Sequence, residues 1–228
     1  MQNFVSVFDG AMDSIKGVIR MGLETVSSFL NLFSNFNIGA AVIISVFIIM
    51  LAFGILRNGS DFSKQIKQTK TLAICAMLIA AKVILNYFSI DFTSYLRIGF
   101  SFIVTPIAGS LFGPIIGGIV AILSDITAFI IKPTGGFLFT YTLSVGVGGI
   151  LYGLMLYKKK PTVVRILIAN TVVMLVVNII LNSIALAPTA GSGLIGIMPS
   201  RIIKNLLQLP IQTVITYIVL KATVHRIK

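Results

Sequence analysis

The stretch Gly113-Pro-Ile-Ile-Gly-Gly-Ile-Val-Ala-Ile-Leu-Ser-Asp-Ile-Thr-Ala-Phe-Ile-Ile131 decides the fold class of this chain. Its only charged side chain is that of Asp125, and its length matches the roughly 20 residues that a helix needs to cross a bilayer. It lacks the alternating pattern of a membrane barrel strand. Over the whole chain 57% of residues are hydrophobic and 11% are charged, against about 25% charged in soluble proteins. The sequence therefore predicts an all-α integral membrane protein.

Seven apolar segments are candidates for membrane-spanning helices. We expect them at 38–56, 71–88, 97–111, 113–131, 138–157, 162–186 and 199–221. Residues 1–37 have apolar side chains at helical spacing and are expected to form an amphipathic helix at the membrane interface. The chain then divides into two units. Residues 1–70 hold the amphipathic stretch, an extra hydrophobic helix and a basic linker, and residues 71–228 form a six-helix membrane domain.

The net charge of +12 is concentrated in connections and helix ends. Cations gather in 57–70, in 158–160 and in the C-terminal stretch from Lys221 onwards. Because cytoplasmic loops carry an excess of Lys and Arg, these three regions, including the C-terminus, are expected to be cytoplasmic. Nucleic-acid binding explains the charge less well, since no soluble basic domain surrounds the cations. We therefore expect the chain to lie in the lipid bilayer and not to bind nucleic acid.

Residues suited to catalysis are scarce in the apolar segments. Of six carboxylates only Asp125 lies deep in a span, and the one histidine, His225, lies in the C-terminal tail. The spans contain no Ser/His pair, no paired aspartates and no metal-ligand spacing. The glycine-rich pieces lack the Lys-Ser/Thr ending of a phosphate loop and are typical of close helix packing. We expect no metal and no cofactor, and no hydrolysis of ATP by the chain itself.

A polar face interrupts the last apolar segment. Arg201, Lys204, Asn205 and Gln208 are spaced i, i+3, i+4 and i+7, so a helix places them on one side. A charge at the centre of a membrane helix costs on the order of 3 kcal/mol, so these groups need partners. Either the face binds an anionic, hydrogen-bonding ligand, or its cations extend to lipid headgroups while its amides join helices. The topology places the start of this face near the external surface, which favours a ligand role for Arg201 and Asn205 over Lys204.

Further polar residues are expected in the same outer layer of the membrane domain. They are Arg97, Asp125, Lys132, Tyr141 and Asn182. Together with the polar face they offer cations for a carboxylated group, and a carboxylate and amides for a nitrogen-rich ring. This set suits an anionic heteroaromatic molecule. The alternative is that Asp125 forms a structural ion pair with Lys132 or Arg201.

A face of small residues lies on the segment 71–88. Ala76 and Ala80 form a small-xxx-small pair within Leu72-Ala-Ile-Cys-Ala-Met-Leu-Ile-Ala-Ala81. Such a face lets another helix approach closely, either inside the bundle or from a partner protein. The neighbouring Cys75 is expected to be a small packing residue.

From about residue 70 to the C-terminus the chain resembles the substrate-binding S components of energy-coupling factor (ECF) vitamin transporters, most closely the folate-specific branch. The resemblance lies in the six-helix layout, the Ala76-Met-Leu-Ile-Ala80 face, the run from Leu96-Arg-Ile-Gly-Phe100 to Leu111-Phe-Gly-Pro114, and Ser124-Asp125 with the following Pro133-Thr-Gly-Gly136 loop. The closing Pro199-Ser-Arg-Ile-Ile-Lys-Asn205 contributes to the likeness to the folate-specific members.

The resemblance implies high-affinity capture of a vitamin outside a prokaryotic cell by a multi-pass plasma-membrane protein. The S component would then dock on a membrane coupling subunit driven by two ATP-binding subunits, through Ala76 and Ala80, and topple to release its cargo. For folate we expect Arg97 and Arg201 at the anionic end. The candidates for the ring are Asp125, Asn182 and Asn205. The alternatives are an S component for riboflavin, thiamine or pantothenate, or, from another class, a membrane-embedded enzyme or channel-like protein working through Asp125.

Overall fold

The computed structural model describes residues 38–87, 90–93, 96–98, 100–132, 137–186 and 193–227. Six helices in these segments are long and apolar enough to cross a membrane, and Ser101–Phe112 is a shorter apolar helix. The prediction of an α-helical membrane bundle is therefore confirmed. The amphipathic helix expected at 1–37 lies outside the described residues.

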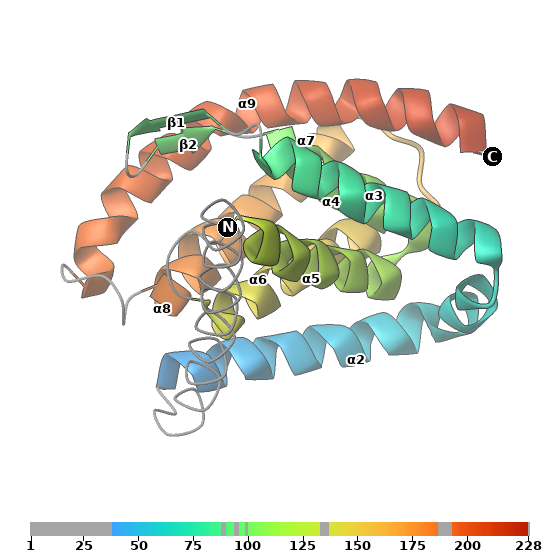
Figure 1. The fold of residues 1–228 in the computed structure, drawn as a ribbon, viewed down its shortest axis with the longest axis horizontal. Helices are drawn as coiled ribbons and strands as arrows, with labels where there is room; N and C mark the ends of the chain where they lie inside the picture. Colours follow the sequence, from blue (N-terminus) through green and yellow to red (C-terminus); the bar gives the residue numbers. More distant parts are fainter. Residues whose placement is uncertain are drawn as a thin grey trace, which may run out of the picture.

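The helices follow one another along the chain with short connections (Figure 1). They are α2 (Ile38–Ile66), α3 (Thr69–Tyr87), the 3₁₀ helix η1 (Phe100–Ile103), α4 (Val104–Phe112), α5 (Pro114–Ile131), α6 (Phe139–Leu156), α7 (Val163–Val173), the π-helix η2 (Met174–Leu181), α8 (Asn182–Leu186) and α9 (Gly193–Ile227). Two short strands, β1 (Ile90–Thr93) and β2 (Leu96–Ile98), form an antiparallel hairpin between α3 and η1. Figure 1 shows α2 and α9 on opposite sides of the bundle, with α5 and α6 between them.

The expected helix at 97–111 begins later than predicted. Arg97, which we expected to start this helix, lies in β2 and is paired with Asp91 of β1. The helical part starts only at Phe100, with η1. Hydropathy does not separate a short apolar strand from a helix, and here the backbone groups of Leu96–Ile98 pair across the hairpin.

The helix α2 is longer than the predicted span 38–56. It continues to Ile66 through a kink at Asn58, which has φ −136° and ψ 17°. The segment 57–70, expected to be a linker, is therefore mostly helical. Polar residues on its inner side contact the end of α6 and hold it there. Lys158 Nζ lies 2.6 Å from Asp61 Oδ2, and Gln65 Nε2 donates to Tyr157 Oη at 2.7 Å. The hydrogen bond to Asp61 raises the pKa of Lys158 above its ordinary value.

Packing along the length of α2 joins this helix to the rest of the bundle. Ile43 is fully buried in the main apolar cluster. A Cβ atom added to Gly39 would lie 2.8 Å from Ile184, and one added to Gly54 would lie 3.6 Å from Pro114. The extra hydrophobic helix thus contacts α8 near one end and α5 near the other.

Glycines allow α4, α5 and α6 to pack almost backbone against backbone. A Cβ on Gly109 would lie 2.7 Å from the Gly153 nitrogen, and a Cβ on Gly149 would collide with the Gly117 backbone. The turn between α4 and α5 is made by Gly113, whose φ of 88° favours glycine. The close helix packing predicted from the glycine-rich pieces is therefore present.

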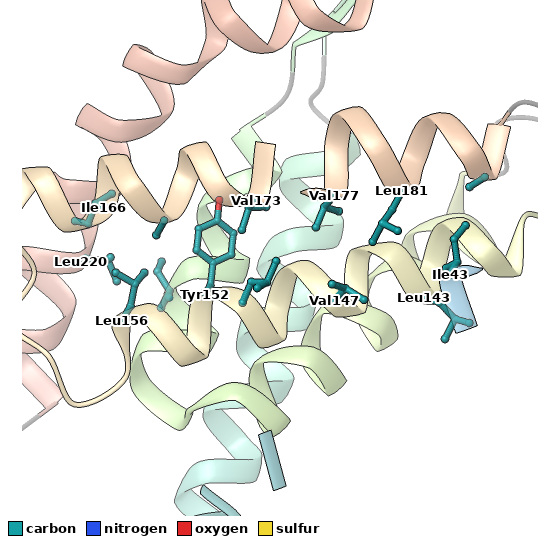
Figure 2. Close-up of a cluster of buried hydrophobic side chains, with 14 residues drawn as sticks. Ile43, Leu143, Val147, Tyr152, Leu156, Ile166, Val173, Val177, Leu181 and Leu220 are labelled. Atoms are coloured by element: carbon teal, nitrogen blue, oxygen red, sulfur yellow. The ribbon is translucent and has the colours of Figure 1, made fainter. Parts of the chain in front are cut away.

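The main core lies between α6 on one side and α7 with η2 on the other. Figure 2 shows Val147 and Tyr152 of α6 facing Val173 and Val177. The Tyr152 hydroxyl donates to Asn170 Oδ1 at 2.9 Å, which places one polar group inside this apolar cluster. Buried polar groups need such partners, so this bond fixes α7 against α6.

Candidate functional site

The polar residues selected from the sequence lie at one end of the bundle. The hairpin, the last turn of α5 and the first turns of α6 and α9 are at this end, which we call the hairpin end. The cations of 57–70, 158–160 and Lys221 lie at the opposite end, which we call the basic end. The charge is thus strongly asymmetric along the helix axes.

Asp125 is at the centre of the first group of polar residues at the hairpin end. Its Oδ2 accepts a 2.7 Å hydrogen bond from the hydroxyl of Thr142, a residue of α6 that is 1% exposed. Lys82, partly buried on α3, lies close enough to this carboxylate for a long-range charge attraction, although no ion pair joins the two among the described residues. The carboxylate is therefore held by α6 and lies near a cation of α3. Lys82 and Thr142 were missed in the sequence analysis, although a lysine inside an apolar helix is itself a signal of a functional site.

The second polar group joins η2 to the polar face of α9. Arg201 Nη1 donates to the Asn178 carbonyl at 3.2 Å, and Asn178 Nδ2 donates to Asn205 Oδ1 at 3.2 Å. Asn205 Nδ2 in turn donates to the Arg201 carbonyl at 2.9 Å. Arg201 and Asn205 are thus held in one hydrogen-bonded cluster. Asn178, which contacts both, was not among the selected site residues.

The polar face of α9 points into the bundle. Arg201, Lys204, Asn205 and Gln208 are all half-buried, whereas the alternate positions are exposed apolar residues: Ile202, Ile203, Leu206 and Leu207. A membrane helix with this division presents its apolar side to lipid and its polar side to neighbouring helices or a ligand.

Asn182 and Ser183 begin α8 and are both buried, with Asn182 4% exposed. Among the described residues, Asn182 Oδ1 and Ser183 Oγ have no hydrogen-bond partner. A buried polar atom without a partner is costly, so its presence calls for a ligand or an ordered water.

The other selected residues are placed at the same end. Lys132 ends α5, where its N–H donates to the Ala128 carbonyl, and its side chain is half-buried. Tyr141 is half-buried in the first turn of α6 and packs against the main core. For Arg97 the structure describes the strand position alone.

The alanine face of α3 lies on the surface of the bundle. Ala76 and Ala80 are exposed, while Cys75 is buried with Ala108 and Val120. Within the described residues the alanine face is therefore not packed inside the bundle. These two small side chains face outwards, so another helix can approach this surface closely.

Comparison with known proteins places this arrangement in a family. The family model of the ECF transporter, substrate-specific component, matches residues 70–220. The chain belongs to this family of S components. It is a multi-pass membrane protein and a subunit of a transporter.

Individual relatives of this S component are folate transporters. The folate transporter FolT of Clostridium novyi (strain NT) is 32% identical over 151 residues, which cover 66% of this chain and 88% of that protein. The folate transporter FolT of Leuconostoc mesenteroides is 28% identical over 158 residues, covering 67% of this chain and 85% of that protein. A crystal structure of FolT bound with folic acid matches with a TM-score of 0.61 and 33% identity, covering 66% of this chain and 92% of that one.

Proposed function

We propose that this S component binds folate with high affinity outside the cell and delivers it to an ECF transporter. The observation that carries the proposal is the likeness to FolT over nearly the whole length of FolT, including the structure with folic acid bound. The polar groups at the hairpin end support it, because they provide both kinds of chemistry that folate requires.

The pterin ring of folate presents two donors and an acceptor along one edge. A carboxylate or an amide can pair with such an edge. Asp125, held by Thr142, is our candidate for this role, with the amides of Asn182 and Asn205 as further candidates. The buried Asn182 Oδ1, which lacks a partner among the described residues, would be satisfied by a ring donor.

The glutamate tail of folate carries two carboxylates, which need cations. We assign Arg201 and Arg97 to this end, with Lys132 as a further cation. Gln208 would add an amide on the same face of α9, and the ring of Tyr141 would add a stacking surface. Arg201 keeps donors for a ligand, since only its Nη1 contact to Asn178 is used in the described cluster and a guanidinium has five N–H groups.

Docking on a membrane coupling subunit with two ATP-binding subunits is the second part of the proposal. The exposed Ala76 and Ala80 would form the docking surface, since small side chains let helices approach closely. The basic end, with the C-terminus, would face the cytoplasm by the positive-inside rule, and the hairpin end would face outwards.

A thermal-stability panel tests the ligand assignment. Purified protein in detergent is heated alone and with folate, riboflavin, thiamine or pantothenate at equal concentration. A ligand at 100 times its Kd stabilises the folded state by about 2.7 kcal/mol, so folate should raise the midpoint clearly and the others should not. A shift by another vitamin and none by folate would show an S component of different specificity. No shift by any of them would contradict vitamin binding.

A further inference from the structure

The fifth membrane span contains a π-helical segment that the sequence did not predict. This segment, η2, lies between α7 and α8, and at its end the N–H of Asn182 donates to the carbonyl of Val177, five residues earlier. Such i to i+5 segments are rare and are frequently found at functional sites. The π-helix is located in the half of the span that approaches the hairpin end.

The wider winding of η2 affects which residues share a face. A regular α-helix turns by about 100° per residue, so Asn170 and Asn178 would point about 80° apart. A π-helix has more residues per turn and reduces this difference. In the structure both side chains contact α9: Asn170 Nδ2 donates to Thr213 at 3.1 Å, and Asn178 Nδ2 donates to Asn205 at 3.2 Å.

The two asparagines nevertheless have different neighbours. Asn170 is 2% exposed and belongs to a network closed by the Tyr152 hydroxyl and the Thr213 hydroxyl. Asn178 instead contacts two residues of the candidate site, since its carbonyl accepts from Arg201 and its amide donates to Asn205. Asn170 therefore joins helices, whereas Asn178 contacts Arg201 and Asn205 directly.

We propose that η2 is a positioning element of the ligand site and that Asn178 is its positioning residue. The winding of η2 places the backbone carbonyl of residue 178 against the Arg201 guanidinium, and the Asn178 side chain orients the Asn205 amide. This inference rests on the proposed function, because it takes Arg201 and Asn205 as groups that contact folate. Asn178 acts through them and needs no contact of its own with the ligand.

A double-mutant cycle tests this role. Folate titrations are made with the wild type, Asn178→Ala, Asn205→Ala and the double variant, and the unfolding midpoint of each is measured without ligand. If Asn178 acts through Asn205, Asn178→Ala should raise the Kd by on the order of 10-fold, and should raise it little further in the Asn205→Ala background. Asn170→Ala is the matched control, expected to lower the unfolding midpoint while leaving the Kd near the wild-type value.

Two results would overturn the inference. The first is an Asn178→Ala variant with wild-type Kd, whatever its stability. The second is a pair of effects that add independently, which would give Asn178 a role separate from Asn205. A wild-type protein that binds no folate would instead contradict the proposed function itself, and the inference with it.

Discussion

Thr142 on α6 donates a 2.7 Å hydrogen bond to the carboxylate of Asp125 on α5. The positive charge of Lys82 on α3, the helix that also carries the exposed alanine face, lies close enough to attract the same carboxylate. A carboxylate in a membrane span requires such partners, because an unpaired charge there costs several kcal/mol. This group therefore links the candidate ring site to the helix proposed to dock on the coupling subunit.

The first prediction concerns this hydrogen bond. Asp125→Asn should raise the folate Kd by on the order of 10-fold to 100-fold, since a charge-assisted hydrogen bond contributes about 1.5 to 3 kcal/mol. Thr142→Val should raise the Kd less, because it keeps the carboxylate and removes only the hydroxyl that holds it in place. Thr127→Val is the control, since its hydroxyl bonds only to the Leu123 carbonyl within α5 in the described structure. Titration calorimetry measures all three. Wild-type affinity in Asp125→Asn would remove Asp125 from the site.

The second prediction concerns the alanine face. Ala76→Trp should abolish folate uptake by the assembled transporter in vesicles while leaving folate binding by the isolated subunit unchanged, because the bulky ring keeps a partner helix away. Ile218→Trp is the control, since Ile218 is an exposed residue on a different helix, α9. Normal uptake by Ala76→Trp would contradict docking through this face.

The third prediction concerns the packing of α5 against α6. Gly149→Ala should lower stability by about 1 to 3 kcal/mol, because the new methyl group would collide with the Gly117 backbone. Gly148→Ala should be tolerated, since its Cβ would lie 3.7 Å from Val173 and Val177 in ordinary contact. Thermal unfolding in detergent, followed by circular dichroism, compares the two. Equal midpoints would mean that the two helices are not packed this closely.

The fourth prediction concerns the extra helix α2. Ile43 is fully buried in the core, whereas Ile49 on the same helix is 64% exposed. Ile43→Ala should therefore lower the unfolding midpoint, with a loss of about 2 kcal/mol from packing and cavity formation, and Ile49→Ala should not. An unchanged midpoint in Ile43→Ala would show that α2 is not packed on the bundle in the isolated protein.

The strongly apolar helices were predictable from the sequence to within a residue. α5 was expected at 113–131 and is Pro114–Ile131, and α6 was expected at 138–157 and is Phe139–Leu156. Both have Gly, Pro or Lys residues at or near the ends of an apolar run, so local composition is sufficient to predict where these helices begin and end. The polar side of α9 was also predictable, because its residues repeat at helical spacing.

The remaining features depend on contacts between distant segments. The strand position of Arg97 follows from pairing with β1, and the extension of α2 beyond Arg57 follows from contacts with Tyr157 and Lys158. The π-helix η2 has no distinguishing sequence pattern, so the contacts of Asn178 with Arg201 and Asn205 were not predicted. Lys82 could have been found, because a cation within an apolar helix needs a partner, and Asp125 was already known as a carboxylate within a span.

Direct titration of folate into the purified full-length protein tests the central claim most directly. The chain contains no tryptophan, so calorimetry is preferable to intrinsic tryptophan fluorescence. The account predicts one folate per chain with a Kd below about 1 μM, which corresponds to about −8.2 kcal/mol, and a marked loss of affinity in Arg201→Ala and Asp125→Asn. Saturable binding of another vitamin with no heat from folate, or folate binding that neither substitution weakens, would contradict it.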